Sequence, residues 1–191
     1  MGVVSVLTVA KVLVIAPFIN IVYNILYAII SIIQGYYGEA IIYIGLMIPI
    51  CVLSIISWLK NKNKENTDVV EVNKIKGKEY TYLAIATVLA TVAFYFLLKV
   101  LNTNQLIIST ISLVTSIVAS YLMLRRCSYY ALGFILNDVI LIILWSLVVV
   151  ESGIGYLPTV ISFSVFLIND IYGLIHWKWE EKKQQKKAEV K

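Results

Sequence analysis

Two acidic residues lie deep inside long apolar stretches of this chain, and each directly follows an asparagine. The two pairs are Asn137-Asp138 and Asn169-Asp170. An Asp at the centre of a membrane-spanning helix costs on the order of 2.5–3.5 kcal/mol. A contact between helices needs only an amide, which contributes roughly 0.6 kcal/mol. The two Asn-Asp pairs therefore predict a polar ligand-binding site, and hydrogen bonding between helices is the alternative.

Other polar and aromatic side chains are expected at the same depth. Asn24 lies near the middle of an earlier apolar run, with Tyr27 one helical turn further on. Trp145 follows Asp138 by seven residues, about two helical turns, so it shares a helix face with that acid and is placed to stack on a planar ligand. The candidate substrate-binding residues are Asn24, Tyr27, Asn137, Asp138, Trp145, Asn169, Asp170 and Tyr172.

Catalysis and metal binding find no support in the sequence. His176 is the single histidine, and no nucleophile–histidine arrangement is visible. Gly153-x-Gly155 lacks the strand and helix of a dinucleotide-binding motif. Cys51 and Cys127 form no disulfide framework and are interpreted as structural thiols. We expect no catalytic residue, no metal, no cofactor and no nucleic-acid partner.

The elements that must position these residues are membrane-spanning helices. The 191 residues are 60% hydrophobic and 14% charged, whereas a soluble domain is about a quarter charged. The apolar residues form blocks of about 20, long enough to cross ~30 Å of hydrocarbon as helices. The sequence predicts an all-α, multi-pass membrane protein, located in the plasma (inner) membrane. The seven expected helices cover residues 2–15, 17–35, 38–59, 79–100, 105–124, 129–150 and 156–178.

Two polar segments and the basic residues predict the orientation. Residues 61–78 can only form a loop, and residues 180–191 are interpreted as a solvated, disordered tail. With this loop in the cytoplasm, its lysines, the tail lysines, Arg125-Arg126 and Lys11 all lie on one side, and Lys99 lies opposite. Basic residues concentrate on the cytoplasmic side of membrane proteins. The sequence therefore predicts an N-out, C-in topology.

Seven helices in this topology allow a 3+1+3 arrangement of parallel repeats within one transmembrane domain, residues 1–191. Repeat one would be residues 1–60, the loop 61–78, a linker helix 79–100, repeat two 105–179 and the basic tail 180–191. Trp58-Leu59-Lys60 and Trp177-Lys178 end the third and seventh expected helices alike. These tryptophans, with Trp179, are interpreted as interface-belt residues.

Several stretches resemble the PnuC family of vitamin transporters. Residues 128–145 (SYYALGFILNDVILIILW) resemble the sixth helix of that family, and residues 156–158 and 166–177 (FLINDIYGLIHW) its seventh. In the first half, Leu26-Tyr27-Ala28 and Tyr37-Gly38-Glu39 resemble further family stretches. The resemblance covers most of the chain apart from the 61–78 loop and the tail.

The resemblance implies a transporter that imports nicotinamide riboside by facilitated diffusion, with relatives that take deoxynucleosides, thiamine or riboflavin. It implies seven helices in a 3+1+3 arrangement, a homotrimer, and a cytoplasmic kinase that traps the imported molecule by phosphorylation. In that family substrates bind at midplane through amide side chains and aromatic stacking. This chain departs from the family by carrying Asp138 and Asp170 beside the amides, and it starts directly at a short first helix.

Three functions remain open at this point. A facilitator for a nucleoside-type molecule is the first hypothesis, with nicotinamide riboside before a purine deoxynucleoside. A proton-coupled transporter would use the two carboxyl groups to carry protons. A membrane scaffold would use the Asn-Asp pairs to hold helices together.

Overall fold

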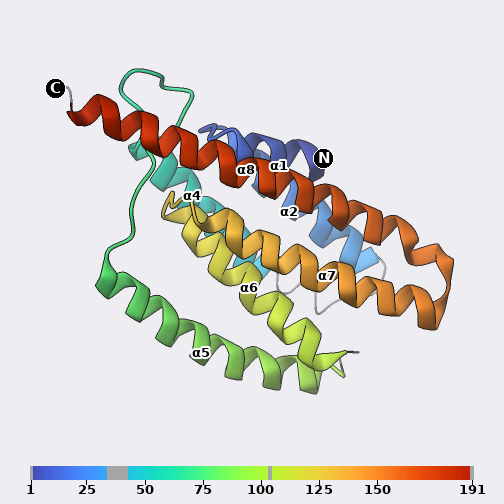
Figure 1. The fold of residues 1–191 in the computed structure, drawn as a ribbon. Coiled ribbons are helices and arrows are strands. Elements are labelled where there is room, and N and C mark those ends of the chain that lie inside the picture. Colours follow the sequence, from blue (N-terminus) through green and yellow to red (C-terminus); the bar gives the residue numbers. More distant parts are fainter. Residues whose placement is uncertain (1, 34–42, 103–104, 190–191) are drawn as a thin grey trace.

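The computed structural model describes residues 2–33, 43–102 and 105–189, and this part of the chain is helical (Figure 1). Its seven α-helices are α1 (Gly2–Ala10), α2 (Ala16–Ile33), α4 (Ile48–Lys60), α5 (Gly77–Val100), α6 (Leu106–Leu124), α7 (Tyr130–Ser152) and α8 (Leu157–Glu189). A π-helical turn, η1 (Tyr43–Met47), leads into α4, and a 3₁₀ turn, η2 (Ile154–Tyr156), leads into α8. The prediction of an all-α protein is confirmed.

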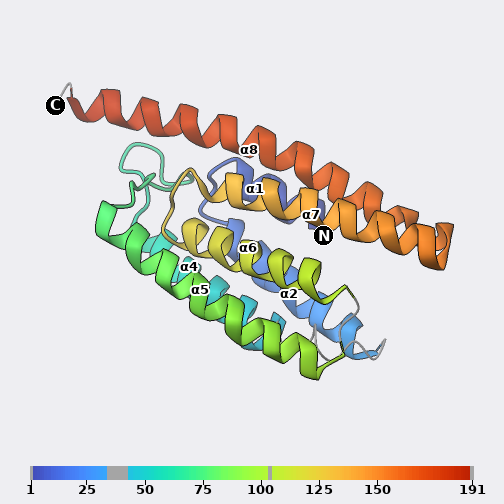
Figure 2. The same cartoon turned by 60° about the horizontal axis from the view of Figure 1, so that its bottom comes forward.

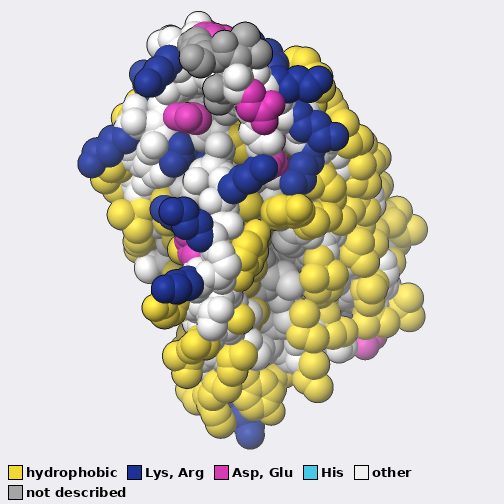
Figure 3. All heavy atoms as spheres, turned by 60° about the vertical axis from the view of Figure 1, so that its left-hand side comes forward, with side chains coloured by type: hydrophobic (Ala, Val, Ile, Leu, Met, Phe, Trp, Pro, Cys, Tyr) yellow, Lys and Arg dark blue, Asp and Glu magenta, His cyan; other side chains and the backbone are white. Residues whose placement is uncertain are grey.

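Five helical segments are long and apolar enough to cross a membrane. They are Tyr43–Lys60, Gly77–Val100, Leu106–Leu124, Tyr130–Glu151 and Ile154–Lys187. Figure 3 shows hydrophobic side chains over the flanks of the molecule and charged side chains gathered at one end. We call this the charged end; it contains the 61–78 loop and the last turns of α8.

The first helix is shorter than predicted. The expected helix covered residues 2–15, whereas α1 has nine residues and ends at Ala10. At 1.5 Å per residue it spans only about 13 Å, less than half of the hydrocarbon core. The helix stops because Val12 adopts φ 61° and the Val14 N–H donates to the Asp68 carbonyl (2.9 Å). The 61–78 loop thus bonds to the Val14 N–H and, through the Val70 N–H (3.0 Å), to the Val12 carbonyl.

The helices pack as a bundle with one peripheral member. α7 lies between α6 and α8, α1 packs on α8 and α2, and α4 packs on α2 and α6. α5 contacts α6 and lies at the edge of the bundle in both ribbon views (Figures 1 and 2). Leu98 is the buried hydrophobic residue of α5, so most of this helix faces outward. The core lies at the charged end and combines residues of the other six helices with residues of the turns and the 61–78 loop, among them Val70 and Ile75.

The turns after α1 and α6 are built alike. The Val12 N–H donates to the Val9 carbonyl (2.9 Å), and the Arg126 N–H donates to the Met123 carbonyl (2.9 Å). Val12 and Arg126 also share a left-handed backbone, with φ 61° and 58°. The next helix begins six residues after the end of the first in both cases, at Ala16 and at Tyr130. The Ala16 N–H donates to the Leu13 carbonyl, and the Tyr130 N–H donates to the Cys127 carbonyl.

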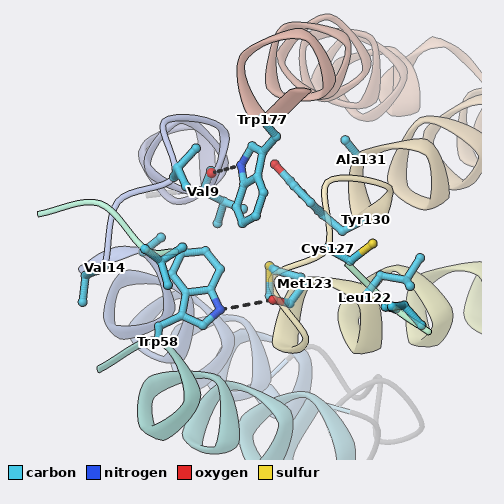
Figure 4. Close-up of a cluster of buried hydrophobic side chains, with 13 residues drawn as sticks. Val9, Val14, Trp58, Leu122, Met123, Cys127, Tyr130, Ala131 and Trp177 are labelled. Atoms are coloured by element: carbon cyan, nitrogen blue, oxygen red, sulfur yellow. Dashed lines mark hydrogen bonds between the residues drawn. The ribbon is translucent and has the colours of Figure 1, made fainter. Parts of the chain in front are cut away.

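Trp58 and Trp177 complete this correspondence from α4 and α8 (Figure 4). Trp58 Nε1 donates to the Met123 carbonyl (3.1 Å), and Trp177 Nε1 donates to the Val9 carbonyl (2.8 Å). Both side chains are fully buried, with ring centroids 5.7 Å apart. The prediction that they are interface-belt residues is therefore wrong, whereas Trp179 is 56% exposed. Each indole is a second donor to a carbonyl at the end of a helix, which also accepts the turn N–H of Val12 or Arg126.

The interpretation of residues 180–191 as a disordered tail is also wrong for the described part. α8 continues as a helix to Glu189. Gln184 accepts from the Val72 N–H (2.9 Å) and donates to the Val70 carbonyl (3.2 Å). Lys187 forms an ion pair with Glu65. The Gln184 amide thus acts like a peptide group toward the 61–78 loop, which itself remains non-helical up to Gly77, as predicted.

Candidate functional site

Asp138 of α7 and Asp170 of α8 meet where these two helices pack together. Their exposed fractions are 4% and 7%, and their side chains lie close enough to interact electrostatically. Among the described residues, the ion pairs do not include either acid. The two acids that the sequence singled out therefore form one buried, uncompensated carboxyl pair.

Three buried polar atoms around this pair have no hydrogen-bond partner. They are Asp138 Oδ2, Asn169 Oδ1 and the Tyr130 hydroxyl. Tyr130 is 1% exposed, and its hydroxyl interacts electrostatically with Asp170. Asn169 Nδ2 donates to Asp170 Oδ1 (3.4 Å), and Asn169 Oδ1 has no partner. Buried polar groups are nearly always paired in folded proteins, so these three oxygens are available to accept further hydrogen bonds.

Asn137 points to a different neighbour than Asp138. The hydroxyls of Ser112 and Thr115 on α6 both donate to Asn137 Oδ1, at 2.9 and 3.0 Å. Consecutive residues of an α-helix are about 100° apart around its axis, so Asn137 faces α6 while Asp138 faces α8. The structure gives Asn137 a contact between helices, which was the alternative role for an amide at this depth.

Asn24 also pairs within the bundle, on the other side of it. Its Nδ2 donates to the Cys51 sulfur of α4 (3.2 Å), and both residues are buried. Asn24 therefore belongs to the contact between α2 and α4, not to the contact between α7 and α8. Asn24 and Cys51 hold the place between their helices that Asp138 and Asp170 hold between theirs.

The aromatic candidates contact other aromatic rings. Tyr27 packs on Tyr43, with ring centroids 4.4 Å apart. Trp145 stacks on Tyr156 of η2 at 5.9 Å. Tyr172 is 44% exposed and stacks on His176. A role for these three side chains in substrate binding stays a prediction.

Two residues of these contacts were missed in the sequence. Cys51 was interpreted as an ordinary structural thiol, although it lies in an apolar run at the depth of Asn24. Tyr130 starts α7 eight residues before Asp138, about two turns away on the same face, and this spacing was its available signal. Its long side chain reaches along α8, where its hydroxyl would lie 3.1 Å from a Cβ added at Gly173.

These features define a helical membrane protein with a polar site between two of its spanning helices. Comparison with known proteins identifies the family. Residues 1–179 match the model of the nicotinamide mononucleotide transporter family, and the chain belongs to this family. The resemblance to the PnuC family is thereby confirmed, and this family is one of transporters.

Two relatives illustrate the similarity. The nicotinamide riboside transporter PnuC of Neisseria mucosa is 26% identical over 156 residues, which are 80% of this chain and 59% of that protein. The chain thus spans less than two thirds of this relative. The crystal structure of the vitamin B3 transporter PnuC matches with a TM-score of 0.78 at 23% identity, over 95% of this chain and 79% of that one. This structural match supports the fold.

Proposed function

We propose that this chain carries a nucleoside-type molecule, first of all nicotinamide riboside, across the membrane and binds it at the Asp138–Asp170 contact. The observation that carries the proposal is the set of buried oxygens without partners: Asp138 Oδ2, Asn169 Oδ1 and the Tyr130 hydroxyl. Groups that only hold helices together are usually paired with one another, whereas these oxygens remain available as acceptors. The family of the chain supports transport.

The chemistry of nicotinamide riboside complements these oxygens. The molecule carries a positive charge on its pyridinium ring, N–H donors on its carboxamide and O–H donors on its ribose. A carboxylate attracts the positive ring, and carboxylate and amide oxygens accept the N–H and O–H donors. Hydrogen bonds to a charged group contribute roughly 1.5–3 kcal/mol. A purine deoxynucleoside, which lacks the charge, is the second substrate class.

The remaining parts of the proposal concern how the transporter lies and works. The charged end faces the cytoplasm, giving N-out, C-in in the inner membrane, because basic residues concentrate there. α1, α2 and α4 form one repeat and α6, α7 and α8 the other, in a 3+1+3 arrangement with α5 as the linker. The matched turns and the matched indole bonds of Trp58 and Trp177 support this assignment.

Transport proceeds by facilitated diffusion in a homotrimer, and a cytoplasmic kinase traps the product. The contact between two carboxyl groups also favours a second mechanism, in which they carry a proton. Carboxyl groups in contact without a neighbouring cation share protons, as in the aspartic-protease dyad. Uptake into liposomes separates the two, because a protonophore abolishes proton-coupled accumulation and leaves facilitated diffusion unchanged.

Uptake of labelled nicotinamide riboside into proteoliposomes tests the main proposal. Asp138→Asn and Asp170→Asn each remove a charge with little change in shape, and uptake is expected to fall about 10- to 100-fold. Asp68→Asn, at an exposed acid of the 61–78 loop, is the matched control and is expected to leave uptake unchanged. Full uptake by both membrane variants refutes the site. A panel with deoxyadenosine, thiamine and riboflavin assigns the substrate.

A further inference from the structure

A cavity of about 400 Å³ lies at the charged end of the molecule, outside the membrane-core site. The second half of the 61–78 loop, the start of α5, the turn between α6 and α7, and α8 enclose it. Its lining contains three lysines and a single acid: Lys74, Lys178, Lys182 and Glu181. Small-molecule pockets have volumes of about 300–1,000 Å³, so this one is large enough for a small ligand.

Glu181 does not make the pocket acidic, because its carboxylate is already saturated. Ser128 Oγ donates to Oε2 at 2.6 Å and Lys178 Nζ to the same oxygen at 3.3 Å. Gln185 donates to Oε1 at 3.3 Å, and Lys74 Nζ lies 3.8 Å from that oxygen. The side chain of Glu181 is 11% exposed, and it forms ion pairs with both Lys74 and Lys178.

The lysines keep donors for a ligand. Each ammonium carries three N–H donors, and Glu181 occupies one of them on Lys178. Lys182 takes part in none of the ion pairs that join described residues. Cys127 adds no negative charge to the wall, because burial raises the pKa of its thiol. With three ammonium groups against one carboxylate, the lining has a net positive charge.

The pocket also has aromatic walls and a rigid back. Tyr80 and Tyr129 line it, and Lys178 Nζ lies 3.6 Å above the centre of the Tyr129 ring. Cys127 and Ile75 belong both to the pocket lining and to the buried core around Trp177. One wall of the pocket is therefore part of the buried core.

We propose that this pocket binds a phosphate-ester anion, either a soluble phosphomonoester or the phosphate of a lipid headgroup with a net negative charge. Lysine ammonium groups are common phosphate ligands, because they pair a full charge with freely oriented N–H donors. The site stands at the charged end, where Trp179 is exposed, so both a soluble ester and a headgroup can reach it. The assignment does not depend on which molecule the membrane-core site carries.

Binding measurements on the full chain in nanodiscs test the proposal without any transport substrate. In the soluble arm, ribose 5-phosphate is titrated calorimetrically into protein in phosphatidylcholine nanodiscs. In the lipid arm, the melting temperature is compared between nanodiscs of phosphatidylcholine alone and nanodiscs with added phosphatidylglycerol. The proposal expects a response in at least one arm.

Substitutions then locate the response. Lys182→Gln leaves the Glu181 network intact and is expected to weaken binding about tenfold, the effect of losing one charged hydrogen bond. Lys182→Glu is expected to abolish binding. Lys186→Gln, one turn further along α8 and outside the pocket, is the matched control and should change affinity less than twofold. Silence in both arms, or equal losses in Lys182→Gln and Lys186→Gln, overturns the proposal.

Discussion

The described helices other than α5 form two sets, α1, α2 and α4, and α6, α7 and α8. The two sets share a frame, by which we mean the turn after the first helix and the indole bond to the end of that helix. They differ in the polar pair between their second and third helices. In the first set, Val9 offers its carbonyl to the indole of Trp177. In the second, Met123 offers its carbonyl to the indole of Trp58. Each set thus supplies the tryptophan that closes the end of the other set's first helix, and the same hydrogen-bonded turn follows in both.

The polar pairs, Asn24–Cys51 and Asp138–Asp170, differ in their hydrogen bonding. Asn24 and Cys51 satisfy one another with a hydrogen bond of 3.2 Å. Asp138 and Asp170 are equally buried, but they leave Asp138 Oδ2 without a partner. On this difference in chemistry we propose the second set as the place for a ligand and the first as a structural counterpart.

The largest expected effect is the difference in uptake between variants of the Asp138–Asp170 pair and variants of the Asn24–Cys51 pair. Cys51→Ala and Asn24→Ala should each change uptake of nicotinamide riboside less than threefold, because their hydrogen bond serves only the contact between α2 and α4. Asp138→Asn should lower uptake about 10- to 100-fold. Proteoliposome uptake at matched protein amounts measures both, and equal losses in the two helix pairs would remove the asymmetry.

The two buried tryptophans should respond alike if the shared frame is real. Trp58→Phe and Trp177→Phe each delete one of the two N–H donors to a buried carbonyl, which together with lost packing costs about 1–2 kcal/mol of unfolding free energy. Denaturant unfolding in detergent micelles measures this, and Trp179→Phe, at an exposed site, serves as the control. A large loss for one variant alone would show that the two bonds are not equivalent.

The contact between the first and second helix of each set is built differently. Ser5 of α1 donates a hydrogen bond to Asn20 of α2, whereas α6 and α7 approach closely at Gly133 and Ala119. A Cβ at Gly133 would lie 2.8 Å from the Cβ of Ala119, so Gly133→Ala should cost about 1–2 kcal/mol through overpacking.

Gly45→Ala provides the matched control, because a Cβ there meets nothing within 4 Å. Thermal unfolding of the two variants in the same detergent compares them. If Gly133→Ala melts at the wild-type temperature, α6 and α7 are not in the close contact described above.

The smallest effect is expected from the extension that α8 has and α4 lacks. Gln184→Ala removes two hydrogen bonds to the 61–78 loop and should cost about 0.5–1 kcal/mol at this exposed end. Hydrogen exchange of the Val72 amide, which donates to Gln184, should become faster, while Gln185→Ala should leave it unchanged. An unaltered Val72 rate in Gln184→Ala would mean that the loop and the tail are not joined in solution.

Sequence reasoning found the depth of the polar groups better than their direction. Counting residues from the ends of the apolar runs brought Asp138 and Asp170 together, because the rise per residue of a helix is fixed. The same count could not tell that Asn137 faces α6 and that Asn24 faces α4. Those directions depend on how each helix is rotated against its neighbours, which requires the packed structure.

Composition misled at the ends of the helices for a related reason. Trp58 and Trp177 stand beside lysines, a pattern typical of the membrane interface, yet each indole is needed by a helix end across the bundle. The polar tail was predicted to be disordered, but its Gln184 amide forms hydrogen bonds with the loop. In both cases a contact distant in the sequence decided the outcome.

Calorimetric titration of nicotinamide riboside into the protein in nanodiscs tests the central claim most directly. The wild type and Cys51→Ala are expected to bind with equal affinity, whereas Asp138→Asn and Asp170→Asn are expected to bind at least tenfold more weakly. Equal affinity in all four proteins would contradict the assignment of the substrate to the contact between α7 and α8.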